Sequence, residues 1–424
     1  MKPKSNILSV KFFLLSFYGL IFINLSAQIP TTSFDYPYSM AGIHSYLNFN
    51  SNVINKPIYS KFLNGGEISR QAIDNSLDQL NGQNRAGYDF INLMYFKESV
   101  DSMFGKYNGS RWIGFRTFDH LDAGFSDDLY KLIFLGNLPF KGKELKLSPL
   151  SVTQLTFKEL IFGIEQEIIR NERLVKQGIS FSVISGNRYW DLWSDDLSFY
   201  TSSTGDSLVL KGRIMHSESD SLARKYFSLN GWGIGTSFFT EIPLTDCDII
   251  RIGMDGFGYV FWNKNSLNYQ WDSTLTFTGF HLGKFSSIED SVSNQIRQYE
   301  DNAKFLSSKN LFGTLLPAFF NFSYNRYVAR NFEITAGLQL RIMANYRPFI
   351  YLRPSYFIKQ DFVAHFNISH GGYGGWIFGI NLEKKFKNRW IVTLGSQNLP
   401  GIFSPNGYGF HYQAGIRWMV ASKN

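Results

Sequence analysis

The chain has 424 residues, a formal net charge of +8 and one cysteine, Cys247. This charge is too small for the length to indicate a nucleic-acid-binding surface, and one thiol cannot build an internal disulfide framework. Aromatic residues make up 17% of the chain and charged residues only 18%, a balance typical of a large antiparallel β-structure whose wall is rich in rings.

The N-terminus has the pattern of a secretory signal peptide. Lys2, Lys4 and Lys11 precede an apolar run over residues 12–25, and the small residue Ala27 marks the expected cleavage site. The run is shorter than the roughly 20 residues that a spanning helix needs, so a retained membrane anchor is the less favoured alternative. We therefore assign 1–27 to the signal peptide and 28–424 to a single exported domain, whose charge falls to +5 once the three lysines are removed.

The first half of the mature chain reads as a series of strands interrupted by one helix. A short strand is expected over 44–50, and helical spacing of Ile68, Ala72, Ile73, Leu77 and Leu80 predicts a helical insertion near 68–80. The strands expected next are 88–97, 111–118, 129–137, 153–169, 178–191, 197–201, 208–215, 227–241, 248–262 and 268–281. Residues 203–206, Ser-Thr-Gly-Asp, are a hairpin turn signal.

The period of the apolar residues changes from two to about 3.6 after the strand at 268–281. The apolar positions that recur every three to four residues are Ile288, Val292, Ile296, Tyr299, Ala303 and Leu306. A second helical insertion is therefore expected near 286–307. We favour a helix packed on its own domain over a cap or a partner-binding element.

The C-terminal hundred residues carry the clearest strand pattern. In residues 331–342 every even position from Phe332 to Ile342 is apolar, and the odd positions are polar or small. Only a strand, with its period of two, places these residues on two separate faces. The same alternation returns around 320–325, 362–369, 376–383, 390–394 and 408–418, with short connections that require antiparallel neighbours.

Repeated amphipathic strands of this kind admit two architectures. A soluble multi-sheet protein would bury the apolar faces against one another, whereas a membrane barrel would turn them toward lipid. Strand length, export without disulfides and the uninterrupted strand–turn run favour the second. The expected fold is all-β, a transmembrane antiparallel β-barrel of about 14 strands with short helical loop insertions.

Several segments resemble an uncharacterised family of outer-membrane β-barrels of the Bacteroidota. They are IFLGN at 133–137, KELIFGI at 158–164, GISFSVISG at 178–186 and DGFGYVFWN at 255–263. That family is distantly similar to the long-chain fatty-acid transporter barrels, which implies 14 strands, an N-terminal segment near the lumen and no catalytic residue. One departure is the C-terminus, because the aromatic Trp418 is followed by six further residues.

The polar faces of the last strands supply the candidate site. The candidate lumen-lining residues are Asn321, Asn325, Glu333, Gln339 and Arg341; a purely structural role in a plugged barrel is the alternative. The histidines show no zinc-binding spacing, so neither a metal nor another cofactor is expected. An enzyme is not expected, although Ser369, His365 and His411 would share the polar wall.

The sequence thus predicts a barrel of the cell outer membrane that passively takes up a hydrophobic or amphipathic small molecule. Its expected partners are outer-membrane lipid and such a ligand, not nucleic acid. The alternative is a non-transporting membrane scaffold, or a barrel that docks a protein partner through one of its helices.

Overall fold

The computed structural model describes residues 39–103, 107–170, 172–220, 228–279, 306–342, 345–387 and 389–420. The strand β14, Phe332–Arg341, shows how the sequence pattern is used. Its odd positions Glu333, Thr335 and Arg341 are buried, whereas the even positions Ala336 and Leu340 are exposed. Polar side chains therefore point into the molecule and apolar ones point outward, the reverse of a water-soluble sheet protein.

Fourteen antiparallel strands of the described chain form a closed ring, which confirms the predicted fold. The ring closes where β1 pairs with β19, from Ser39 opposite Val420 to Asn50 opposite Gly409. In ring order the strands are β1 Ser39–Ser51, β2 Asn84–Met103, β3 Tyr107–Phe125, β5 Leu150–Arg170, β6 Arg173–Thr201, β8 Gly231–Pro243, β9 Asp248–Trp262, β13 Phe319–Ala329, β14 Phe332–Arg341, β15 Arg347–Lys359, β16 Phe362–Gly372, β17 Trp376–Phe386, β18 Trp390–Ser396 and β19 Gly409–Val420.

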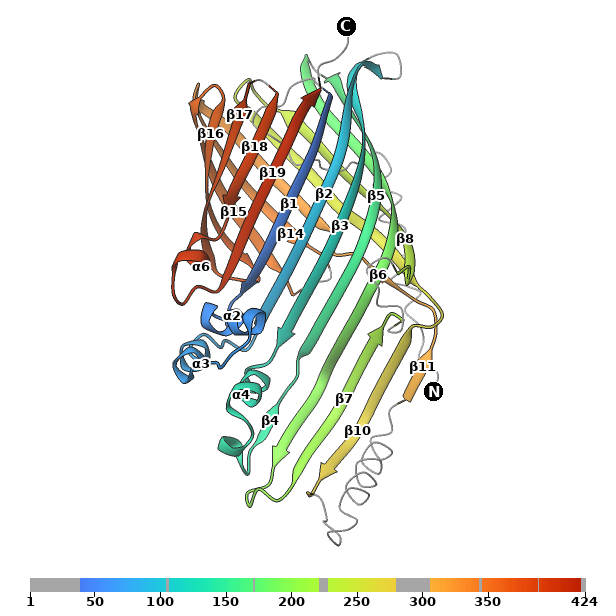
Figure 1. Ribbon diagram of the computed structural model, residues 1–424, viewed down its shortest axis with the longest axis vertical. Coiled ribbons are helices and arrows are strands. Elements are labelled where there is room, and N and C mark those ends of the chain that lie inside the picture. The colour runs from blue at the N-terminus through green and yellow to red at the C-terminus, as the bar shows by residue number, and fades with distance from the viewer. Residues whose placement is uncertain are drawn as a thin grey trace.

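The two ends of the barrel differ. At the upper end in Figure 1, where β19 ends, tight turns join β13 to β14, β15 to β16 and β17 to β18; we call this the short-turn end. At the lower end, the long-loop end, the connections contain helices. These are α2 Lys56–Asn64, α3 Arg70–Leu77, α4 Asp127–Leu135, the 3-10 helix η1 Leu138–Phe140 and α6 Leu399–Phe403.

A smaller sheet extends from the long-loop end of β6. The lower half of β6 pairs with β7 Leu208–Glu218, which pairs with β10 Leu267–Phe277, and β4 Glu144–Lys146 lies on the other side of β6. Short strands β11 Leu306–Lys309 and β12 Phe312–Leu315 pair with β10 and β9. Leu145, Leu147, Leu197 and Trp271 give this extension its own buried core, against which Leu129 of α4 packs.

Two local expectations need correction, and one helix was missed. Residues 129–137, predicted as a strand, lie largely in the helix α4, because the Ser126 side chain caps it by accepting from the Leu129 N–H and two aspartates occupy its first turn. The helix α2 was not predicted. The strands expected at 178–191 and 197–201 are one strand of 29 residues, β6.

The first helical insertion is present as α3, within the predicted range 68–80. The signal peptide 1–27 lies outside the described residues, as does the second insertion near 286–307, except that Leu306 and Ser307 belong to β11. In the described part of the chain, every helix is too short or too polar to cross a bilayer.

Candidate functional site in the barrel interior

The five candidate lumen residues of β13 and β14 all point inward, but the structure does not gather them at one place. The Gln339 side-chain amide donates to the Asn321 Oδ1 at 3.0 Å, across the β13–β14 pair. Asn325 donates to the neighbouring Thr335 hydroxyl at 3.2 Å. Glu333 is buried near the short-turn end, opposite Ser355 in the strand register. The fifth residue, Arg341, reaches across the barrel.

Arg341 forms an ion pair with Asp89 of β2, a strand that is not its neighbour in the ring. Its Nη1 and Nη2 donate to the two Asp89 carboxylate oxygens at 3.0 and 2.7 Å, and the side chains are 0% and 4% exposed. Asp89 also lies 2.9 Å from the His120 Nδ1. The guanidinium lies 4.3 Å from the centre of the Phe319 ring. This bidentate pair ties opposite walls together through the lumen.

Two connections from the long-loop end fold inward and fill the barrel beside this pair. We call Asn345, Tyr346 and Tyr373 the inner plug. Asn345 binds the opposite wall, since its backbone N–H and side-chain amide donate to the two Asp122 carboxylate oxygens at 2.8 and 2.7 Å. The Tyr346 ring meets the Tyr373 ring edge-on at 5.2 Å, and Tyr373 is fully buried.

Arginine side chains attach the plug segments around Tyr346 and Tyr373 to the barrel rim. Arg85, at the beginning of β2, donates to the backbone carbonyls of Gly372 and Gly374 at 3.0 and 3.1 Å. Arg347 donates to the Gln83 side chain at 2.8 Å. The plug is thus attached by hydrogen bonds from turns and side chains, not by the strand ladder that builds the wall.

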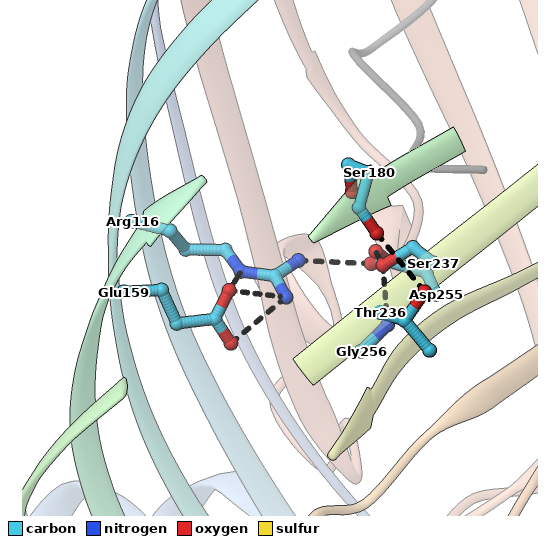
Figure 2. Close-up of polar contacts among 7 residues, drawn as sticks. All are labelled: Arg116, Glu159, Ser180, Thr236, Ser237, Asp255 and Gly256. Atoms are coloured by element: carbon cyan, nitrogen blue, oxygen red, sulfur yellow. Dashed lines mark hydrogen bonds and ion pairs between the residues drawn. The ribbon is translucent and has the colours of Figure 1, made fainter. Parts of the chain in front are cut away.

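A second charged cluster lies further toward the short-turn end (Figure 2). Arg116 of β3 donates to both Glu159 carboxylate oxygens at 3.2 and 3.1 Å, and its Nη1 donates to Asp255 at 2.9 Å. Glu159 is its register partner on β5, but Asp255 comes from β9. Arg116 therefore bridges two parts of the wall that are not adjacent.

A β-bulge aims Asp255 at Arg116. The β8–β9 register shifts so that Asp255 and Gly256 both oppose Ser237, and Gly256 has a left-handed φ of 72°, which glycine adopts without steric cost. The Ser237 hydroxyl donates to Asp255 and accepts from the Gly256 N–H, each at 2.9 Å, as Figure 2 shows.

Aromatic and aliphatic side chains also face inward, beside the charged groups. Phe118 stacks on Phe157 at 5.0 Å, and Tyr189 packs on Trp262 at 5.5 Å. We call the inner aromatic cluster the buried residues Phe118, Leu155, Phe157, Ile184, Val260, Trp262 and Leu316. Phe118 lies between Arg116 and His120 on the inner face of β3, so the cluster adjoins both ion pairs.

A small cavity lies next to the plug. A cavity of about 40 Å³, lined by Tyr46, Asn48, Gln339, Tyr346 and Tyr373 among others, has room for only a few water molecules. In this conformation the inner plug and the ion pairs occupy the lumen at that level.

The structure separates the Ser and His residues on which a catalytic alternative depends. Ser369 accepts from Asn367 at 3.0 Å, whereas the His365 Nδ1 lies 2.8 Å from the Ser355 hydroxyl. The His411 Nδ1 accepts from the Gln397 N–H at 2.9 Å. Among the described residues, no group of three or more His, Cys, Asp or Glu side chains is arranged to hold a metal ion.

Sequence reasoning missed most of the charged interior, namely Asp89, Arg116, His120, Glu159 and Asp255. The sequence did contain an indication for two of these residues. Arg116 and Glu159 each interrupt an apolar strand, at positions that face inward. Ionisable residues inside membrane strands are costly unless they are paired, so such positions indicate a partner across the lumen.

Neither protein-family models nor curated proteins yield a match to this chain. Among solved structures, a FadL homologue from Pseudomonas aeruginosa is similar at 9% identity and a TM-score of 0.43, covering 94% of this chain and 96% of that one. The toluene transporter TodX of P. putida is similar at 9% identity and a TM-score of 0.41, and the match covers 92% of each chain. The translocator domain of the autotransporter NalP from Neisseria meningitidis is similar at 8% identity and a TM-score of 0.33. The match covers 97% of this chain and 95% of that one.

Proposed function

We propose that this chain is an outer-membrane β-barrel that passively admits a hydrophobic or amphipathic small molecule through its interior. The observation that carries the proposal is the inner aromatic cluster, which lies beside paired charges inside a barrel with an apolar outer wall. A wide aqueous pore has a polar, water-filled lumen, whereas aromatic and aliphatic side chains are packed together inside this barrel.

The outer wall supports a place in a membrane. Large apolar side chains exposed on it include Phe162, Phe181, Phe322, Leu352 and Phe378. Exposed apolar surface of this extent is costly in water and favourable against hydrocarbon. Barrels of bacterial outer membranes have short periplasmic turns and longer extracellular loops, so the short-turn end would face the periplasm and the helices would face outward.

The two surfaces of the interior favour an amphipathic ligand. An apolar body would pack against the Phe118–Phe157 stack, and a polar group would exchange hydrogen bonds with Arg116 or Asp255. Because the Arg341–Asp89 pair and the Asn345–Asp122 hydrogen bonds cross the lumen, entry would require the inner plug to move aside. The driving force would be the partitioning of the ligand out of water.

Transport can be tested with purified barrel in liposomes that contain a fluorescent fatty-acid reporter. Wild-type protein should accelerate the entry of fatty acids of several chain lengths over protein-free vesicles, and Tyr373→Ala should accelerate it further. Tyr356→Ala, which removes an outward-facing ring of β15, is the matched control and should behave as wild type. If neither wild type nor Tyr373→Ala changes the entry rate across the ligand panel, the proposed function is wrong.

One observation favours the alternative of a partner-docking barrel. The extension built from β6, β7 and β10 has its own core, beyond what closing the barrel requires. Crosslinking in intact cells distinguishes the two roles, since a docking barrel should yield a defined protein crosslinked through this extension. Recovery of only lipid and barrel-assembly factors would count against docking.

A further inference from the structure

The strands β19, β1, β2 and β3 lie side by side in the barrel wall (Figure 1). Their outward side chains line a hollow on the outer surface. Its volume is about 750 Å³. The short outward side chains of Ala41, Ser45 and Ala414 leave the space open, and longer ones such as Phe96 and Trp418 stand around it. In a membrane this hollow faces hydrocarbon, so something apolar must fill it.

A second hollow of about 490 Å³ lies next to the first on β2, β3, β5 and β6. The two share Phe96 and Ile113, which form a ridge between them. Each is lined mainly by aliphatic and aromatic side chains. Two adjacent apolar hollows that share lining residues suit the two acyl chains of one phospholipid.

An ion pair stands at the short-turn end of the second hollow. Glu98 and Arg111 are register partners on β2 and β3, and the Arg111 Nε donates to Glu98 at 2.6 Å. Both side chains point outward and are 42% and 66% exposed. Charged side chains on a lipid-facing wall are rare and costly, unless they reach the headgroup region or find a partner there.

We propose that the two hollows and the Glu98–Arg111 pair form a binding site for one phospholipid with a zwitterionic headgroup that carries a primary amine. The acyl chains occupy the hollows on either side of Phe96 and Ile113. The phosphate binds the Arg111 guanidinium and the ammonium group binds the Glu98 carboxylate. Because the pair has no net charge, it complements a dipolar headgroup better than an anionic one.

The length of the site agrees with one leaflet. Along β3, the lining of the two hollows runs from Arg111 to Phe115, a span of four residue steps. At about 3.3 Å per residue and a tilt near 45°, this span corresponds to a depth of roughly 9 Å, which lies within one half of a bilayer core of about 30 Å. The site therefore fits a lipid of the leaflet at the short-turn end.

The site can be tested by native mass spectrometry of the purified barrel after exchange into mixed micelles that contain equal amounts of phosphatidylethanolamine, phosphatidylcholine and phosphatidylglycerol. Wild-type protein should retain one phosphatidylethanolamine in preference to the others. Ala414→Phe, which fills the first hollow, should lose the bound lipid. Ala336→Phe, at an exposed outward position of β14, is the matched control and should keep it.

The headgroup assignment has its own variants. Arg111→Gln with Glu98→Gln should still bind phospholipid but lose the preference for phosphatidylethanolamine. Arg213→Gln, which breaks the exposed Arg213–Asp195 pair on the β6–β7 extension, should leave the preference intact. Heat-modifiable migration on gels checks that each variant is folded. Equal retention of the three lipids by wild type, retention unchanged in Ala414→Phe, or a wild-type dimer that Ala414→Phe dissociates would each overturn the proposal.

Discussion

The ring of Tyr373, between β16 and β17, lies against the backbone of Gly87 on β2, a strand that neighbours neither of them in the ring. A Cβ atom placed on Gly87 would come within 2.0 Å of the Tyr373 ring, so only glycine allows the inner plug to seat at this point of β2. The Tyr373 ring of the plug therefore occupies the space that a side chain at position 87 of the wall would fill. The absence of a side chain on one strand decides where a turn nearly 300 residues later can lie.

Gly87→Ala should displace Tyr373 and loosen the plug. Because the neighbouring Gly42-to-Tyr95 and Asp89-to-Arg341 contacts remain, the barrel should fold while its lumen opens. We expect faster swelling of proteoliposomes in small sugars and a larger single-channel conductance than for wild type. Gly375→Ala is the control, since a Cβ there meets open space; equal conductance of the two variants would contradict the role assigned to Gly87.

Arg341→Met should destabilise the barrel strongly. It leaves the buried Asp89 carboxylate without its cation, and breaking a buried ion pair by removing one partner costs about 3–5 kcal/mol. The free energy of unfolding can be measured with guanidinium in lipid vesicles. The double variant Asp89→Asn with Arg341→Met should recover part of the loss, whereas Arg326→Met, which affects an exposed arginine, should change little.

Gly256→Ala should disrupt the bulge that aims Asp255 at Arg116. A residue with a Cβ loses roughly 1–2 kcal/mol in the left-handed region, and relief of that strain would move Asp255 away from the guanidinium. The measurement is again the free energy of unfolding. Gly256→Asn should lose less stability than Gly256→Ala, because asparagine tolerates a positive φ better than alanine does. An equal decrease in the free energy of unfolding for both variants would show that the conformation of Gly256 is unimportant.

The helices at the long-loop end should loosen at alkaline pH. Burial raises the pKa of Tyr130, in α4, to about 12, and its hydroxyl donates to the Ser76 hydroxyl of α3 at 2.7 Å. The neutral phenol is the form that the folded state favours. Its contribution to stability is therefore complete below pH 10 and is lost as the pH rises through about 12.

Limited proteolysis between pH 8 and 12 measures this loosening. Wild-type α3 and α4 should become cleavable as the pH passes 10. Tyr130→Phe, which has no proton to lose, should be less stable at pH 8 by about 1 kcal/mol for one hydrogen bond and should lack that pH dependence. A cleavage profile of Tyr130→Phe that still rises with pH would assign the change to another group.

The amino-acid sequence alone determined the wall of this protein. Side chains on a strand alternate faces whatever lies next to them, so the even apolar and odd polar positions of β14 already specify an outer and an inner surface. The return of that pattern, with short turns, specified an antiparallel barrel of about 14 strands. It also placed Arg341 and Gln339 on the inner face.

The helix α4 could not be predicted from its own residues, because the apolar run over 129–137 suits a strand or a helix. Ser126 and the two aspartates after it decided for the helix α4, and those residues lie just outside the run.

Only the tertiary structure decided what the interior does. Arg341 and Asp89 are 252 residues apart, and no local pattern relates them until β1 and β19 close the ring and bring opposite walls within reach. The same holds for Tyr373 with Gly87 and for Arg116 with Asp255. Contacts across a lumen depend on the diameter and register of the closed barrel, quantities that belong to all of its strands together and to no single one.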